Sequence, residues 1–182
     1  MKLTKKEIYA KYGITFDGEK IVSPIGKVCE LLKEGNSKTG KQVYTFSLLP
    51  GTGEYTAEVN GKQYTVKGTC VCNCTGCYAK TGHYRQTSAI RSMVINTFLV
   101  NNYIDFVKNA IMAQLEIIGR GEVRIHAAGD FNTENSEEYS NMWYGIAKKN
   151  NAFRFWTYTK IKQYETLFDY LKNANIVKSV IS

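Results

Sequence analysis

Four cysteines lie close together in this chain of 182 residues, and thiols at such a density are typical of metal chemistry. They are Cys70, Cys72, Cys74 and Cys77, within the string TCVCNCTGCYAKTGHYR. Two disulfides inside so short a segment would strain the sulfur geometry, because a disulfide needs a defined separation and torsion between its two residues. The sequence therefore predicts that these thiols bind a metal ion or a cluster.

The rest of the chain offers few further ligands for zinc. Structural zinc sites usually combine two cysteine pairs separated by a longer loop. No second pair occurs here: the fifth cysteine, Cys29, is distant, and the histidines are His83 and His126. A zinc site would have to draw all four ligands from one short loop or recruit a histidine, and zinc stays an alternative.

The spacing favours an iron–sulfur cluster. With Cys72 set aside, Cys70, Cys74 and Cys77 form the pattern CxxxCxxC, which suits a loop that wraps three corners of a 4Fe-4S cluster. Cys72 is an additional thiol within the same loop. If it took the remaining iron, the cluster would be fully ligated and suited to electron transfer, sensing or structure.

Helices and strands alternate after the cysteines, which predicts an α/β fold with a largely parallel sheet. We expect helices from about 86 to 102 and from 104 to 118, a helix capped by Ser136, and another after Lys160. We expect strands over 123–127, 153–158 and 177–181. The helix at Ser136 has an apolar face at i, i+3, i+4, i+7 and i+8, comprising Tyr139, Met142, Trp143, Ile146 and Ala147.

The first part of the chain, residues 1–68, reads as an N-terminal elaboration, and residues 69–182 as the cysteine loop and the α/β part. A short helix, Lys5–Tyr12, is capped by Thr4. Asn60 and Gly61 separate two alternating segments and predict a type I′ hairpin. Together with a strand over Val43–Leu49, this hairpin is expected to form a small antiparallel meander that leads into the cysteine loop.

Polar residues follow the predicted strands at their carboxyl ends, where parallel sheets bind ligands. Gly129 and Asp130 follow one strand, and Lys160 follows the next. Each has a structural alternative: Gly129 for backbone geometry, Asp130 for capping a turn, and Lys160 for solvation. We interpret His126 as a hydrogen-bonded histidine of the protein interior.

Composition excludes some classes of protein. No apolar run approaches the ~20 residues that span a bilayer, and no secretory signal precedes the fold. We therefore expect no membrane partner and a reducing, cytoplasmic location. The formal charge is +8, and lysines interleaved with tyrosines near the cysteine loop could form a nucleic-acid face. A solvated hairpin face explains the same pattern.

The CxxxCxxC triplet resembles the signature of the radical S-adenosylmethionine superfamily. There, three thiolates hold a 4Fe-4S cluster, and the fourth iron is left open for S-adenosylmethionine. The resemblance implies a partial (β/α) barrel, with Gln63–Lys67 as the strand entering the loop, RIHAAGDF as the second strand, FRFWTYTK as the third and NIVKSVIS as the fourth. It also implies that Gly129, Asp130 and Lys160 lie at the cofactor site.

The chain further resembles a family of phage and mobile-element proteins known as gene product 88. The resemblance rests on the cysteine cluster, the AGDF segment, the YTK strand end, and GNSKTGK followed by VYTFSLLP. It implies an iron–sulfur protein of a phage-infected cell and no particular substrate. Two functions stay open. One is a radical enzyme, supplied by an external electron donor and acting on an unknown substrate. The other is a non-catalytic iron–sulfur or zinc protein, with nucleic acid as a partner.

Overall fold

The computed structural model describes residues 3–35, 42–72, 74, 77, 79 and 81–178. Its α-helices are α1 (Lys5–Lys11), α2 (Thr87–Asn102), α3 (Ile104–Ile118) and α4 (Ser136–Lys149), with short 3₁₀ helices η2 (Gly82–Arg85) and η3 (Lys162–Tyr164). Its strands are β1 (Phe16–Asp17), β2 (Lys20–Val22), β3 (Val28–Cys29), β4 (Lys33–Glu34), β5 (Val43–Thr45), β6 (Glu54–Val59), β7 (Lys62–Lys67), β8 (Gly121–Arg124), β9 (Phe153–Thr159) and β10 (Ala174–Lys178).

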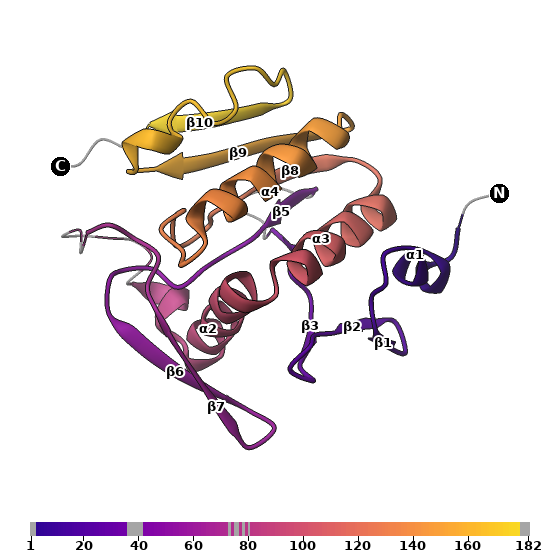
Figure 1. The fold of residues 1–182 in the computed structure, drawn as a ribbon, viewed down its shortest axis with the longest axis horizontal. Helices are drawn as coiled ribbons and strands as arrows, with labels where there is room; N and C mark the ends of the chain where they lie inside the picture. Colours follow the sequence, from indigo (N-terminus) through magenta and orange to yellow (C-terminus); the bar gives the residue numbers. More distant parts are fainter. Residues whose placement is uncertain are drawn as a thin grey trace.

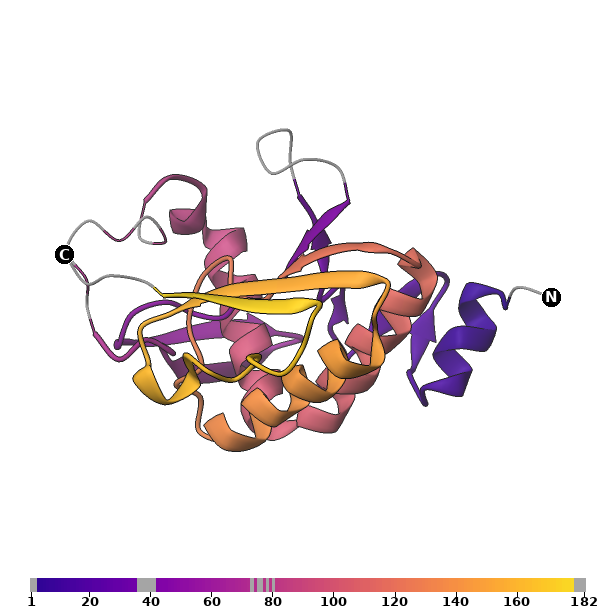
Figure 2. The same ribbon diagram turned by 90° about the horizontal axis from the view of Figure 1, so that it is seen from above.

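The central sheet has the strand order β10-β9-β8-β5-β4 (Figure 1). The four strands from β10 to β5 run parallel, and β4 is antiparallel to β5. Helices α3 and α4 lie on one side of β9 and β10 (Figure 2). The fold is therefore mixed α/β. Within the described residues the sheet is open and does not close into a barrel, so the partial barrel stays a prediction.

The core joins this sheet to its helices through aromatic side chains. The ring of Trp143 on α4 packs edge-on against Phe46, with 5.6 Å between centroids. The apolar face predicted for this helix is confirmed, because all five of its members are buried. The helix starts at Ser136, however, so the predicted cap is wrong by one residue. Asn135 occupies the cap position, and its side-chain amide donates to the Val100 carbonyl at 2.9 Å.

The predicted hairpin is confirmed. Strands β6 and β7 pair across Asn60 and Gly61, whose φ angles of 51° and 77° are those of a type I′ turn. The first helix is also confirmed, with a capping box between Thr4 and Glu7. In Figure 1 the β6–β7 hairpin projects beside α2, away from the central sheet.

The meander predicted before the cysteine loop is wrong. Gln63–Lys67 is a strand that leads into the cysteine loop, as predicted, but it belongs to β7, whose described pairing is with β6, and β5 is the strand that lies beside β8. The reason is the turn through residues 50–53, which directs the chain out of the sheet after β5. Strands from residues 1–68 and from residues 69–182 therefore share the central sheet, and no meander joins β5 to the hairpin.

The helix predicted after Lys160 is also wrong. Only η3 forms, and the chain continues through turns with i→i+3 bonds, including Leu167 N to Tyr164 O at 3.1 Å and Leu171 N to Phe168 O at 2.9 Å. Apolar residues three and four apart can be buried by such turns as well as by an α-helix. The next strand, β10, is described to Lys178, and residues 179–182 of the predicted strand lie outside the described part, as do residues 36–41 of GNSKTGK.

None of the described helices is long and apolar enough to cross a membrane.

Candidate metal centre

The cysteine loop is fixed at its start to the turn that follows β5. The backbone amides of Gly68, Thr69 and Cys70 donate to the carbonyls of Gly53, Leu49 and Gly51 at 2.8, 2.8 and 3.0 Å. A side chain at Gly68 would collide with the Gly51 carbonyl. This close backbone contact sets the direction in which the chain enters the loop.

Thr69, immediately before the first cysteine, joins the loop to the carboxyl end of the β8 segment. Its buried hydroxyl donates to the Leu49 carbonyl at 3.1 Å and accepts from the Asp130 amide at 2.9 Å. Gly129 has φ +84°, and a Cβ there would lie 2.7 Å from the Thr69 Oγ1 and 2.8 Å from the Leu48 Cβ. Glycine is required at this position because of both its backbone conformation and this close approach.

Asp130 connects the ends of two neighbouring strands through its carboxylate. Oδ1 accepts from the Phe131 amide at 2.8 Å and from the Thr159 hydroxyl at 2.7 Å, and Oδ2 accepts from the Lys160 amide at 3.0 Å. Burial raises the pKa of the carboxyl group, and these hydrogen bonds oppose that rise. Asp130 therefore holds the start of the segment after β9, which carries Lys160.

Lys160 reaches back to the cysteine loop. Its Nζ lies 3.0 Å from the Cys74 Sγ, which is 2.9 Å from the Cys72 Sγ. The hydrogen bond from Cys72, followed by that from Lys160, lowers the pKa of Cys74. The bond to Cys74 raises the pKa of Lys160. The lowered pKa favours the thiolate form of Cys74, which is the form that binds metals.

The other two loop cysteines, Cys70 and Cys77, are partly buried. Burial raises the pKa of Cys70 to about 11, and Cys77 is partly buried against the hydrophobic core. Among the described residues, no three metal-ligating side chains are already gathered around one point. The four thiols are soft donors, and soft donors fit a thiophilic centre such as an iron–sulfur cluster or zinc.

The remaining candidate residues lie elsewhere. His126 is buried, with Nε2 2.9 Å from the Tyr139 hydroxyl and Nδ1 3.2 Å from Thr157 Oγ1. The interpretation of His126 as a hydrogen-bonded interior histidine is confirmed. Cys29 is a free thiol on β3, and burial raises its pKa to about 11.

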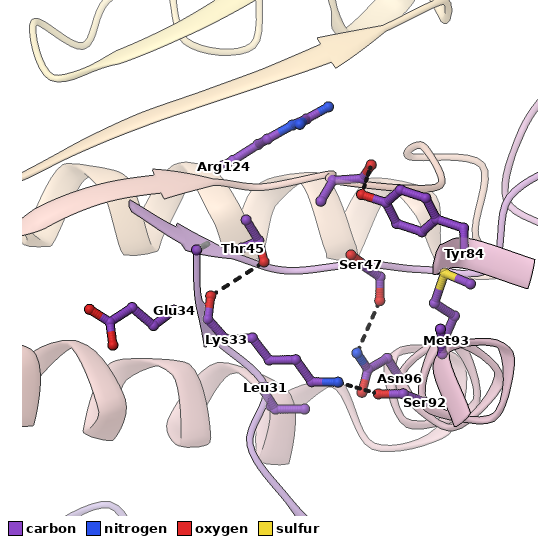
Figure 3. A pocket seen from close by; sticks show the side chains of 13 residues that line it. Leu31, Lys33, Glu34, Thr45, Ser47, Tyr84, Ser92, Met93, Asn96 and Arg124 are labelled. Carbon is purple, nitrogen blue, oxygen red and sulfur yellow. Dashed lines mark hydrogen bonds between the residues drawn. The ribbon is translucent and has the colours of Figure 1, made fainter. Parts of the chain in front are cut away.

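A cavity of about 280 Å³ lies near the loop, between the sheet and the start of α2 (Figure 3). Tyr84, on η2 directly after the cysteine loop, lines it and donates to the Ala127 carbonyl at 3.2 Å. Other lining side chains come from β4, β5, β8 and α2, and include Lys33, Thr45, Asn96 and Arg124. Sequence reasoning missed this cavity and the roles of Thr69 and Thr159, since each arises from contacts between segments far apart in the chain.

Fold and site together define a mixed α/β protein whose cysteine loop meets the carboxyl ends of parallel strands. The model of the gene product 88 family matches residues 30–181, so the chain belongs to that family. No curated protein and no solved structure matches the chain.

Proposed function

We propose that this chain is an iron–sulfur protein in which Cys70, Cys74 and Cys77 ligate a 4Fe-4S cluster. The observation that carries the proposal is the contact of Cys74 with the Lys160 amine, at 3.0 Å. An amine beside a thiol stabilises the thiolate that a cluster requires. A cysteine-ligated cluster of this kind also requires the reducing conditions of a cytoplasm.

The anchoring of the loop supports the same proposal. Thr69 ties the residue before Cys70 to Asp130, and Asp130 fixes the backbone of Lys160. The start of the loop and the lysine that contacts Cys74 are thereby held at the carboxyl ends of β8 and β9, the edge of a parallel sheet where ligands usually bind. Cluster formation would draw Cys70 and Cys77 toward the Cys72–Cys74 pair.

In its enzymatic form, the proposal adds S-adenosylmethionine and an external electron donor. A cluster with one open iron supplies electrons for the reductive cleavage of S-adenosylmethionine, and the substrate is unknown. The residues of this chain would keep Cys74 ionised through Lys160, hold Lys160 through Asp130, and allow close approach of a ligand to the backbone at Gly129.

A second candidate is a non-catalytic centre in which Cys72 is also a ligand. The 2.9 Å separation between the sulfurs of Cys72 and Cys74 favours its zinc form, because the ligands of a single zinc ion must lie close together. Four thiolates would saturate a 4Fe-4S cluster or complete a tetrahedral zinc site.

Single substitutions of cysteine by serine test the ligand set. After anaerobic reconstitution with iron and sulfide, we expect Cys70→Ser, Cys74→Ser and Cys77→Ser each to lose most of the bound iron. Cys29→Ser is the matched control and should retain it, because Cys29 lies on β3, outside the loop. Retention of full iron by all three loop variants would contradict the proposal.

Cys72→Ser then separates the two candidates. If the fourth iron is open, this variant keeps its iron, and S-adenosylmethionine changes the electron paramagnetic resonance spectrum of the reduced wild-type cluster. If Cys72 is a ligand, the variant loses iron, and S-adenosylmethionine leaves the wild-type spectrum unchanged.

A further inference from the structure

Within the described part of the chain, no α-helix covers one face of the central sheet where β9 and β10 lie. In Figure 2, α3 and α4 lie on the opposite side of these strands, and no described α-helix lies over this face. The burial of β9 agrees: Phe153, Phe155 and Thr157 are buried, whereas Arg154 and Tyr158 are exposed. The alternate residues of β9 therefore point to an open face.

The open face carries a strip of two cationic and two aromatic residues along β9. Arg154, Trp156 and Tyr158 occupy alternate positions, and Lys160 follows just beyond the strand. Alternate residues of a strand are spaced by about 6.6 Å. Tyr158 has 43% of its surface exposed, which is unusual for a large aromatic residue within a parallel sheet.

A third cationic residue lies over the aromatic pair. The guanidinium carbon of Arg124 on β8 is 5.2 Å from the ring centroid of Trp156 and 5.7 Å from that of Tyr158. The two rings are edge-on to each other at 5.8 Å. These contacts hold the rings in defined positions, which reduces the entropy lost when a planar ligand stacks on them.

The neighbouring strands leave the face accessible. On β10, Asn175 and Val177 pair in register with Trp156 and Tyr158, and both are exposed. Glu122 on β8 pairs in register with Arg154 and offsets part of its charge. The strip with Arg124 still carries more cationic than acidic groups, in a chain of net charge +8.

We propose that this strip, Arg154 to Lys160 together with Arg124, binds single-stranded nucleic acid. Exposed aromatic rings on a sheet stack on bases, and cationic groups beside them neutralise phosphates. A duplex would not bind in this way, because its base faces are already stacked. The strip ends at Lys160, which contacts Cys74, so a bound strand would pass beside the cysteine loop. The proposal does not depend on a cluster in that loop.

Fluorescence anisotropy of labelled oligonucleotides of about 12 nucleotides tests this inference on the full chain. We expect single-stranded RNA or DNA to bind more tightly than the duplex of the same sequence. Binding should also quench tryptophan fluorescence, and that change reports Trp156, because Trp143 is fully buried.

Matched variants locate the binding surface. Tyr158→Ala should weaken binding roughly 5- to 150-fold, the range for losing one stacked base. Tyr170→Ala removes a tyrosine that is 91% exposed in the turn before β10 and should not weaken it. Arg154→Ala should weaken binding and lower its salt dependence, whereas Lys62→Ala, on the β6–β7 hairpin, should do neither.

Three results would overturn the inference: no binding at low salt, equal affinity for single strands and duplex, or equal effects of Tyr158→Ala and Tyr170→Ala. Thermal unfolding of each variant checks that it is folded. The measurement is made before and after cluster reconstitution. Binding by the protein without a cluster separates this inference from the proposed metal centre, since either can fail alone.

Discussion

Asp130 and Lys160 are linked to each other at the candidate site. Asp130 accepts the Lys160 backbone amide, and the Lys160 amine reaches Cys74. A carboxylate that is already engaged by three donors is poorly placed to ligate a metal. Asp130 is therefore better described as the residue that positions Lys160. Lys160 in turn is the residue whose hydrogen bond, after that of Cys72, lowers the pKa of Cys74.

His126 gives a pH-dependent prediction at the residue scale. Burial, followed by the charge of Arg124, lowers its pKa from 6.5 to about 3. Below pH 6.5 the unfolded chain binds a proton that the folded chain excludes, so His126 makes stability fall as the pH drops from 6.5 toward 3. The expected slope from this residue is about 1.4 kcal/mol per pH unit.

Chemical denaturation across this pH range measures the effect. His126→Gln removes the titrating group, so its free energy of unfolding should fall less steeply with decreasing pH than that of the wild-type protein. Other carboxylates titrate in both proteins, and the difference between the two slopes isolates His126. Parallel slopes would show that His126 is not held neutral by the fold.

Between elements, the joint of the β8 segment and the cysteine loop depends on Gly129. We expect Gly129→Ala to lower the free energy of unfolding by about 2–5 kcal/mol, through its positive φ and the contact with Thr69 and Leu48. Gly145→Ala is the control. Gly145 lies in α4 with no atom within 4 Å of an added Cβ, so alanine there should stabilise by up to about 1 kcal/mol. Equal effects at the two positions, measured by urea denaturation, would contradict this account of the joint.

Local patterns explain which elements could be predicted from the sequence. The hairpin at Asn60-Gly61 and helix α3 follow from turn chemistry and periodicity within the segment itself. The partner of β5 could not be inferred in this way, because its pairing with β8 joins residues far apart in the chain. The prediction of a helix after Lys160 failed because the apolar spacing of this segment suits successive turns as well as a helix.

In the candidate site, too, local sequence patterns could be recognised and contacts between distant residues could not. The spacing of the cysteines identifies the loop, and the positions after β8 and β9 identify Gly129, Asp130 and Lys160. Thr69 could not be recognised, because its hydroxyl meets the Asp130 amide across 61 residues of sequence. The hydroxyl of Thr159 likewise meets Asp130 only in the folded protein.

For the whole molecule, both proposals depend on one open sheet whose strands β5, β8, β9 and β10 run parallel. Its carboxyl edge holds the cysteine loop, and its uncovered face carries the strip from Arg154 to Lys160. The loop and the strip meet at Lys160, where the amine contacts Cys74. This arrangement would let a metal centre and a single-stranded nucleic acid occupy neighbouring positions on one scaffold.

The metal content of the full chain tests the central claim most directly. Iron, acid-labile sulfide and zinc are measured per chain after anaerobic purification and reconstitution. The account predicts about four iron and four sulfide per chain, the content of one 4Fe-4S cluster. About one zinc per chain, with neither iron nor sulfide, would contradict it.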